Sequence, residues 1–515
     1  ADAETALRRL EGLLPAGADA AEAQARRDRV QLLLAQAACA QRRCASVLVL
    51  ASDLASRQVG HGQAQYLVVS ARREQGSGAE YRQALETLAS TPPGTPAYTW
   101  VERALNEHGT YLLKASADAD AAATFKRLFD RNPSGRYAER AAWKYGWWSY
   151  RTGAFDEATR VFESAAAGIP RANTRPAWLY WAGRARERLG DAAGARQRLT
   201  IAAVDYLHSY YGRLAAEALT RLGAPVPTDR SAASGDLVVA LDGGERDPIA
   251  PGDAAPGDEP AATSTSEEAG GTMAGDGAPP NAELITWLVA AEMFDEAVLE
   301  MRHAQRAHGR SPKLDATLAW VYRQQGENRP AINTMRQAYP QYLSVDGDAL
   351  PREIQEVIFP LEYVPLIKRY SARHDLDPFI VAALIGQESS YVADVRSPAN
   401  AWGLMQILPS TGRQLARAEG VTGFRTQRLT DPETNIRLGT RYLATLVRNH
   451  GGVPYALAAY NAGAGRVIRW KADRVGVEPA EFIDDIPFPE TQIYVKKILG
   501  TAVDYRRLYE KVLAE

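Results

Sequence analysis

Residues 377–391, DPFIVAALIGQESSY, read as one helix that ends in a carboxyl group and two hydroxyl groups. Asp377, followed by a proline, is a good helix start, because aspartate accepts hydrogen bonds from exposed amides and proline fits the first turn. Ile380, Leu384 and Glu388 then follow at intervals of four residues and share one helix face. Glu388 therefore continues an apolar stripe.

Two interpretations of Glu388 follow from this position. Its carboxyl group either lies in solvent at a frayed helix end or is drawn into a desolvated cleft. Desolvation would raise its pKa and suit it to donate a proton near neutral pH. Spacing alone favours the solvent alternative, since glutamate is almost never fully buried without a partner.

Three later segments carry further polar residues between apolar ones. Residues 397–412, SPANAWGLMQILPSTG, predict a turn, a glycine at Gly403 and a short helix that stops before Pro409. Residues 455–463, YALAAYNAG, predict a helix that ends in a glycine turn. Residues 486–499, IPFPETQIYVKKIL, predict a helix that Glu490 opens and that carries Tyr494.

Together these segments resemble the catalytic domain of the soluble lytic murein transglycosylases. The resemblance covers about residues 355–510 strongly and is only architectural over the N-terminal part. It rests on four blocks in series: Gln387-Glu388-Ser389, Gly403-Leu404-Met405-Gln406, Ala459-Tyr460-Asn461-Ala462-Gly463, and Pro487-Phe488-Pro489-Glu490-Thr491 with Tyr494 and Val495.

The resemblance implies an all-α protein with a helical superhelix, a small helical linker domain and a lysozyme-like domain. It implies cleavage of the β-1,4 bond between N-acetylmuramic acid and N-acetylglucosamine, with 1,6-anhydro ends as product. Glu388 would be the acid and then the base, without a metal or other cofactor. The other residues it implies cap or polarise the helix end (Ser389, Ser390), line the glycan cleft (Met405, Gln406, Tyr460, Asn461) or support the site (Glu490, Tyr494).

A second catalytic carboxylate would instead make the protein a hydrolytic muramidase. The candidates are Asp394, Asp431, Glu433 and Glu490, and none is marked by its sequence context as a partner of Glu388. A single acid suffices for a transglycosylase, because the C6 hydroxyl of the substrate is the nucleophile and attacks within one molecule. A third alternative is an inactive, glycan-binding scaffold built on helical repeats.

The N-terminal two hundred residues show helical spacing and an internal repeat. Residues 143–158, WKYGWWSYRTGAFDEA, align with residues 180–195, YWAGRARERLGDAAGA, and the step from glycine to alanine returns from Gly326 to Ala331. The offset is close to that of tetratricopeptide-type helical hairpins. Glycine would end the first helix in a left-handed turn, and alanine would let the second helix pack closely.

Length and composition divide the chain into domains. A chain of 515 residues is too long for a single hydrophobic core. A Gly-, Pro- and Ala-rich acidic stretch predicts a flexible linker. The predicted domains are a superhelix (1–228), that linker (229–280), a helical linker domain (281–354) and the catalytic domain (355–515).

Net charge and hydropathy limit the partners and the cellular location that the protein can have. The formal net charge of −2 gives no basic field for nucleic acid, and no apolar run is long enough to span a bilayer. The expected partners are peptidoglycan strands and, through the superhelix, envelope proteins. The substrate implies a periplasmic protein whose signal peptide has been removed. Cys39 and Cys44 leave two alternatives open: a small-loop disulfide or two free buried thiols.

Overall fold

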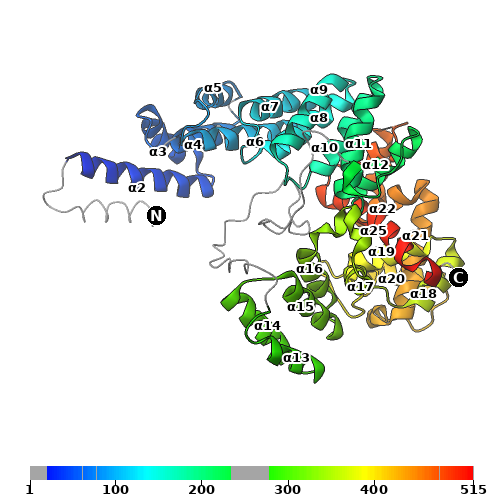
Figure 1. The fold of residues 1–515 in the computed structure, drawn as a ribbon. Helices are drawn as coiled ribbons and strands as arrows, with labels where there is room; N and C mark the ends of the chain where they lie inside the picture. Colours follow the sequence, from blue (N-terminus) through cyan, green and yellow to red (C-terminus); the bar gives the residue numbers. More distant parts are fainter. Residues whose placement is uncertain (1–19, 61, 77, 233–277, 475, 514–515) are drawn as a thin grey trace. The chain divides into compact units, whose positions relative to one another are not determined.

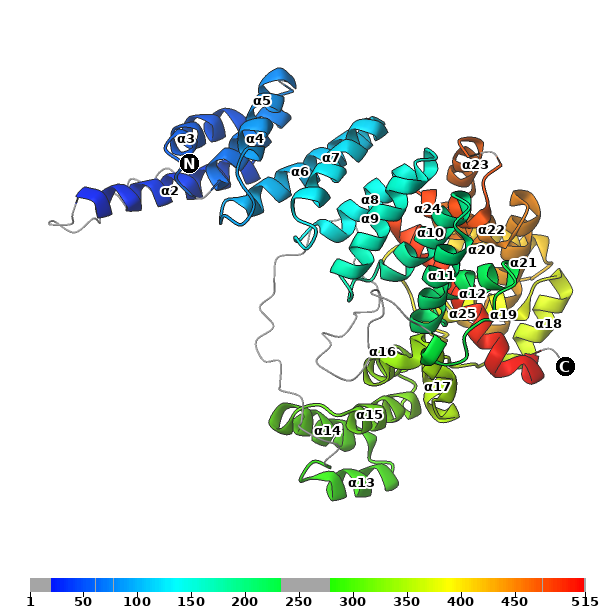
Figure 2. The ribbon, with the colours of Figure 1, turned by 45° about the horizontal axis from the view of Figure 1, so that its top comes forward.

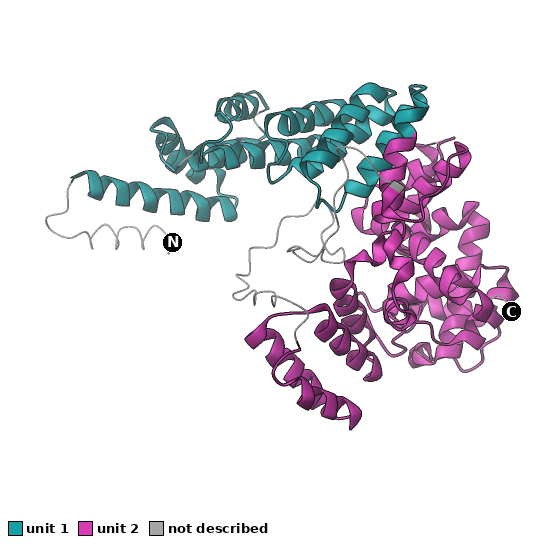
Figure 3. Ribbon diagram, viewed as in Figure 1, with its two compact units in different colours: residues 1–195 teal, residues 196–515 magenta. Residues whose placement is uncertain are grey.

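The computed structural model describes residues 20–60, 62–76, 78–232, 278–474 and 476–513 (Figure 1). Within these ranges the fold is all-α, which confirms the predicted class. Extended pairing in the described part is limited to two isolated bridges, from Trp402 to Arg396 and to Ile407. Two units can be separated, residues 1–195 and 196–515 (Figure 3). The domain boundaries predicted at 228, 280 and 354 stay predictions.

The first unit consists of consecutive antiparallel helices (Figure 2). They are α2 (Ala20–Ala40), α3 (Cys44–Ser56), α4 (Gln63–Glu74), α5 (Gly78–Ala89), α6 (Tyr98–Lys114), α7 (Asp118–Arg131), α8 (Ala138–Arg151), α9 (Phe155–Gly168) and α10 (Arg175–Arg188), and α11 (Ala192–Tyr206) crosses the boundary. Cys39 and Cys44 flank the turn between α2 and α3, and both are free, half-buried thiols.

The repeated small residues do what the sequence predicts. The turn glycines all have positive φ: 81° at Gly153, 79° at Gly190 and 77° at Gly326. The alanines that follow are fully buried: Ala158, Ala195 and Ala331. A Cβ atom added at Gly146 would lie 2.4 Å from the ring of Phe162. The helices therefore cross at a distance that only a residue without a side chain allows.

The second unit contains the segments with the predicted chemistry. Its helices are α12 (Tyr210–Arg221), α13 (Ala282–Ala290), α14 (Phe294–His308), α15 (Pro312–Gln324), α16 (Asn328–Ala338), α17 (Arg352–Ile358), α18 (Val364–His374), α19 (Pro378–Ser389), α20 (Pro409–Ala418), α21 (Pro432–His450), α22 (Val453–Ala462), α23 (Ala464–Ala472), α24 (Pro479–Asp485) and α25 (Pro489–Leu513). Short 3-10 helices are η1 (Arg230–Ala232), η2 (Pro340–Leu343), η3 (Val345–Ala349) and η4 (Thr426–Thr430).

Helix α19 lies at the centre of the C-terminal helices and packs against α25, which in turn packs against α22. Seven consecutive residues of α19, 379–385, are buried, so the whole circumference of the helix lies in the core. Asp377 caps its N-terminus, where Oδ1 accepts a hydrogen bond of 2.9 Å from the amide of Phe379. The predicted helix start is confirmed.

The short helix predicted before Pro409 is wrong. Residues 402–407 form a tight turn in which Trp402 and Ile407 exchange two backbone hydrogen bonds, of 3.1 and 3.0 Å. Gly403 and Gln406 have φ of 75° and 46°, which a right-handed helix does not accommodate. Pro409 begins α20 and does not end a preceding helix.

The acidic linker predicted at 229–280 lies largely outside the described residues, because 233–277 are not described. In the part of the chain that is described, no helix has both the length and the apolar character needed to cross a membrane. The same residues hold no group of three His, Cys, Asp or Glu side chains placed to bind a metal ion.

A buried histidine joins three distant segments of the second unit. His208, whose side chain is 2% exposed, lies 3.2 Å from Asp504 of α25 and 3.3 Å from Asp348 of η3. Its backbone amide donates to the carbonyl of Leu343 in η2. Two arginines also bind these carboxylates. Arg213 pairs with Asp504, and Arg507 lies 3.7 Å from Asp504 and 3.1 Å from Asp348. Burial lowers the pKa of His208, but the two carboxylates outweigh it and hold the pKa above its usual value.

This histidine gives a testable pH dependence. A group with a raised folded-state pKa contributes stability below its unfolded pKa of about 6.5, and that contribution is lost as pH rises through the folded pKa. We expect His208→Gln to lower the free energy of unfolding by about 1 kcal/mol or more at pH 6 and by less at pH 9. Urea unfolding of both proteins at the two pH values measures this, and an equal loss at both would contradict a protonated His208.

Candidate active site

Glu388 lies in the last turn of α19 and points toward α25. Its Oε1 accepts a hydrogen bond of 2.5 Å from the hydroxyl of Tyr494, which is itself 5% exposed. Burial raises the pKa of Glu388 to about 7, the hydroxyl of Tyr494 opposes this, and the negative charge of Glu490 adds to it. The solvent-exposed alternative for Glu388 is therefore wrong, because the carboxyl group lies in a desolvated position.

The chain turns sharply directly after Glu388. Ser389 is buried, donates from Oγ to the carbonyl of Ile385 at 3.0 Å and accepts from the amide of Tyr391 at 3.1 Å. Ser390 and Tyr391 both have positive φ, 52° and 65°, although neither is a glycine. The hydroxyl of Ser389 thus caps the helix end, and both of these hydrogen bonds are to the backbone. Tyr391 is a core residue whose hydroxyl donates to the carbonyl of Ala382.

The glycine turn at 403–406 is held by side chains that bind its backbone groups. A Cβ atom on Gly403 would lie 2.1 Å from the carbonyl oxygen of Leu429, so only glycine fits. The side-chain amide of Gln406 donates to the carbonyl of Gly403 at 2.8 Å. Met405 is fully buried, and its sulfur packs against Gly439. Its side chain therefore faces the core, and its backbone alone is placed to contribute to the site.

Sequence reasoning missed Asn435, which holds this turn from α21. Its Oδ1 accepts from the amide of Met405 at 2.8 Å, and its Nδ2 donates to the carbonyls of Trp402, at 2.9 Å, and Leu429, at 2.7 Å. Asn435 is completely buried. Asn435 lies in the amphipathic helix α21, between Thr434 and Ile436, and no local pattern there signals the partners that it meets.

Helix α22 brings Tyr460 to the same place. Its hydroxyl donates to the carbonyl of Met405 at 2.7 Å, and its ring lies 5.0 Å from that of Tyr442. Burial and then the charge of Glu388 hold the pKa of Tyr460 well above its usual range. Asn461 is exposed, and its Oδ1 accepts from the hydroxyl of Thr491 at 2.5 Å.

The other carboxylates lie elsewhere or have other partners. Asp394 and Glu490 are exposed. Asp431 caps α21 through a hydrogen bond of 2.9 Å from the amide of Thr434, as its position before a proline predicts. Glu433 binds Arg369 and the hydroxyl of Tyr370. Of these four, only the charge of Glu490 contributes to the pKa of Glu388.

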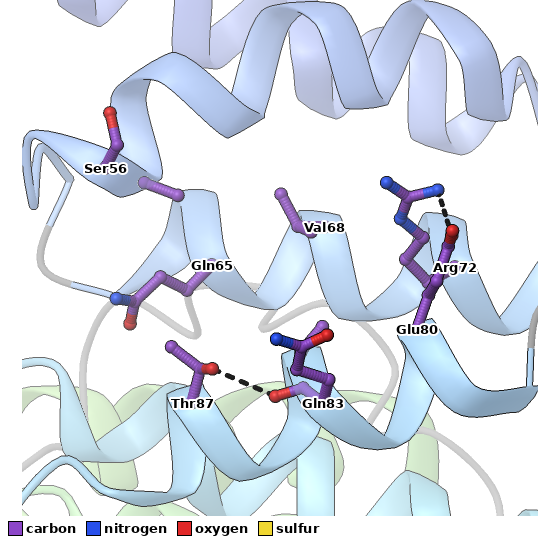
Figure 4. A pocket seen from close by; sticks show the side chains of 9 residues that line it. Ser56, Gln65, Val68, Arg72, Glu80, Gln83 and Thr87 are labelled. Atoms are coloured by element: carbon purple, nitrogen blue, oxygen red, sulfur yellow. Dashed lines mark hydrogen bonds and ion pairs between the residues drawn. The ribbon is translucent and has the colours of Figure 1, made fainter.

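A separate pocket of about 420 Å³ lies between α3, α4 and α5 (Figure 4). Its lining includes Gln65, Gln83 and Thr87, and an ion pair joins Arg72 to Glu80 at one side. Glu80 is the only carboxyl group among the lining residues, and it is exposed and paired. This polar groove lacks the desolvated acid that distinguishes the surroundings of Glu388.

The fold and this site define a class: an all-helical protein with a lysozyme-like C-terminal domain whose central helix ends in one desolvated acid. Comparison with known proteins agrees with this description of the C-terminal part. Residues 365–483 match the family model described as the transglycosylase SLT domain. This part of the chain is therefore similar to the SLT-type domain.

Curated relatives and a solved structure extend the comparison. The soluble lytic murein transglycosylase of Escherichia coli K12 is 39% identical over 151 residues, which cover 29% of this chain and 23% of that protein. The membrane-bound lytic murein transglycosylase C of Serratia proteamaculans is 32% identical over 168 residues, 28% of this chain and 47% of that protein. An inactive mutant of the lytic transglycosylase Slt from Pseudomonas aeruginosa matches with a TM-score of 0.56 at 21% identity, over 98% of this chain and 75% of that one.

Proposed function

We propose that this protein is a lytic murein transglycosylase that cleaves the β-1,4 bond between N-acetylmuramic acid and N-acetylglucosamine and leaves 1,6-anhydro ends. One observation carries the proposal: burial raises the pKa of Glu388 to about 7 while its Oε1 accepts a 2.5 Å hydrogen bond from Tyr494. A carboxyl group in this state is half protonated at neutral pH, so it can donate a proton and take one back.

The proposed reaction uses Glu388 twice. Protonated Glu388 first donates its proton to the oxygen of the leaving N-acetylglucosamine as the glycosidic bond breaks. The acetamido oxygen of the muramic acid stabilises the positive charge at the anomeric carbon. The C6 hydroxyl of the same sugar then attacks that carbon and closes the anhydro ring, while the carboxylate of Glu388 accepts the hydroxyl proton. Attack within one molecule removes the entropic cost of a second reactant and needs no second carboxylate.

The surroundings of Glu388 support these roles. Tyr494 holds one carboxyl oxygen, so the other is available to substrate. Tyr460 fixes the turn at Met405, and the side-chain amide of Gln406 is bound within the same turn, so we infer that this turn forms part of the glycan cleft. Asn461, which follows Tyr460 in the sequence, is exposed and can donate to a sugar through its amide nitrogen. Gly403 and Ser390 adopt positive φ, and the hydroxyl of Ser389 accepts from the amide of Tyr391, so these residues shape the turn at 403–406 and the turn after Glu388.

Digestion of purified peptidoglycan tests the proposal directly. Mass spectrometry of the released fragments distinguishes the three functions that the chain could serve. Anhydro ends support the transglycosylase, reducing ends support a hydrolytic muramidase, and binding without digestion supports an inactive scaffold. The exposure of Asp394 and the capping role of Asp431 favour the first, since neither is placed as a second catalytic carboxylate.

The substrate also sets the proposed location and partners. An enzyme of this kind acts on the cell wall, so we place the protein outside the cytoplasmic membrane, in the periplasm. The helical hairpins of residues 1–228 would bind glycan strands or envelope proteins along their length. The helical linker of residues 281–354 would connect them to the catalytic residues 355–515.

Removing the hydroxyl of Tyr494 should move the pH profile without abolishing activity. That hydroxyl stabilises the carboxylate form and lowers the pKa of Glu388. In Tyr494→Phe the pKa therefore rises further, and we expect the alkaline limb of kcat/KM to move up by about one pH unit. Rates of sacculus digestion between pH 5 and pH 9 measure the shift. A limb that stays in place, or moves down, contradicts the assignment of this hydrogen bond.

A further inference from the structure

The helical hairpin α15–α16 contacts the turn that follows Glu388. Asn328, the first residue of α16, donates from Nδ2 to the backbone carbonyl of Ser390 at 2.9 Å, in a contact that bridges 62 residues of sequence. Both partners are buried, with 4% of Asn328 and 7% of Ser390 exposed. Ser390 lies two residues after Glu388, so a residue outside the catalytic blocks holds the end of the catalytic helix.

The chemistry of its neighbours fixes the orientation of the Asn328 amide. Its Oδ1 accepts from Arg323, which can only donate, at 2.5 Å. Its Nδ2 donates to Ser390 and, at 3.3 Å, to the carboxylate of Glu362, which can only accept. Arg323 and Glu362 also bind each other at 2.6 Å. Both hydrogens of the amide nitrogen are thus engaged, and the contact with Ser390 is a definite donor–acceptor pair.

The turn that Asn328 holds is one the chain does not adopt by itself. Ser390 and Tyr391 are consecutive non-glycine residues with φ of 52° and 65°. Side chains disfavour this backbone region, so it persists only where neighbouring groups hold it in place. Ser389 supplies one restraint by accepting from the amide of Tyr391. The hydrogen bond from Asn328 supplies another at the carbonyl between the two strained residues.

The internal repeat marks the same residue as unusual. Asn328 lies two positions after the turn glycine Gly326, where the corresponding hairpin has Phe155 two positions after Gly153. Residues 294–297 repeat the FDEA sequence of residues 155–158 and likewise begin a helix with a phenylalanine. The hairpin with Gly190 has Ala192 at this position, so of these four hairpins only the one that contacts Ser390 carries an amide there.

We propose that Asn328 is a positioning residue for Glu388. By fixing the carbonyl of Ser390 it holds the left-handed turn closed, and this keeps the carboxyl group of Glu388 directed at Tyr494 and shielded from water. Loss of the hydrogen bond would loosen the helix end, let water reach the carboxyl group and bring its pKa down toward the ordinary range of a glutamate. This inference rests on the proposed role of Glu388 and adds to it a link with the helical linker.

Asn328→Leu tests the proposal, with Gln305→Leu as its matched control. The leucine at 328 fills nearly the same space and leaves the pair of Arg323 and Glu362 intact, but it cannot donate. The control removes a buried side-chain amide of α14 that binds Asp315 of α15 at 2.6 Å, and it leaves Asn328 and its partners in place. We expect Asn328→Leu to lower kcat on peptidoglycan about tenfold with KM changed less than about twofold, and to move the alkaline limb of the pH profile to lower pH. Gln305→Leu should lower Tm with kcat and the pH profile unchanged.

A second readout does not depend on activity. Titration of the carboxyl carbons by NMR, with Glu388→Gln to assign the signal, gives the pKa of Glu388 in each protein. A lower pKa of Glu388 in Asn328→Leu, but not in Gln305→Leu, supports positioning. An unchanged pKa and kcat in Asn328→Leu, or equal changes in both variants, would overturn it. If Asn328→Leu does not fold, Asn328→Ala removes the same donor without adding bulk or charge and should show the same loss of kcat. Wild-type protein that leaves peptidoglycan intact would refute the proposed function alone, because the NMR comparison still decides the role of Asn328.

Discussion

Glu388→Gln is expected to reduce cleavage of peptidoglycan by at least about a thousandfold, because glutamine can neither donate nor take back a proton. The amide keeps the size of the carboxyl group, and its oxygen can still accept from the hydroxyl of Tyr494. Glycan binding should therefore remain close to that of the wild-type protein. Initial rates of sacculus digestion, together with binding of the protein to intact sacculi, measure both quantities. Residual turnover above a few per cent would refute the assignment of the acid.

The same substitution should also stabilise the protein above neutral pH. The folded state holds the proton of Glu388 up to about pH 7, whereas the unfolded chain releases it near pH 4.5. Ionisation of this carboxyl group therefore lowers the folding stability. The loss grows as pH rises from 4.5 to 7 and reaches about 1–3 kcal/mol above pH 7. Glutamine does not ionise, so Tm of Glu388→Gln should equal that of the wild type at pH 4.5 and exceed it at pH 8.

Asp394→Asn is the matched control for the loss of activity. Its carboxyl group is exposed in the loop after α19 and lies close to Glu388 in sequence. We expect this variant to cleave at the wild-type rate and to release anhydro ends. A large loss in Asp394→Asn, with reducing ends in the wild-type digest, would instead indicate the two-carboxylate chemistry of a hydrolase.

Gly403→Ala is expected to destabilise the fold by about 3 kcal/mol or more and to abolish activity. Alanine is strained at a φ of 75°, which costs roughly 1–2 kcal/mol. In addition, its Cβ would lie 2.1 Å from the carbonyl oxygen of Leu429 and 2.3 Å from Nδ2 of Asn435. The backbone must therefore move, and with it the turn that presents Gln406. Urea unfolding and the digestion assay measure the two losses.

Gly420→Ala separates the two causes. Gly420 has a similar φ of 67°, but a Cβ atom there would meet nothing within 4 Å. We expect this variant to lose only about 1–2 kcal/mol of folding stability, from the strained backbone, and to keep its activity. If both alanine variants lose the same stability, the close approach of Leu429 and Asn435 carries no energy, and the account of Gly403 is wrong.

The helices were readable from the sequence because their signals are local. The cap at Asp377, the turn glycines at Gly153 and Gly326 and the apolar run of α19 each depend on residues a few positions apart. The turn at 402–407 was not readable. It is held by Asn435, whose three hydrogen bonds come from a helix about thirty residues later, and no local pattern carries that information.

By itself, the sequence determined the all-α class, the helical repeats and the placing of Glu388 at the end of an apolar helix. It left open whether that carboxyl group meets water, because spacing along one helix does not show what other helices bring to it. The tertiary structure decided this. Helix α25 places Tyr494 on the carboxyl group, α22 places Tyr460 nearby, and the hairpin α15–α16 fixes the turn through Asn328. The pKa of a glutamate depends on the water and the charges around it, and in a folded chain these are set by residues far apart in sequence.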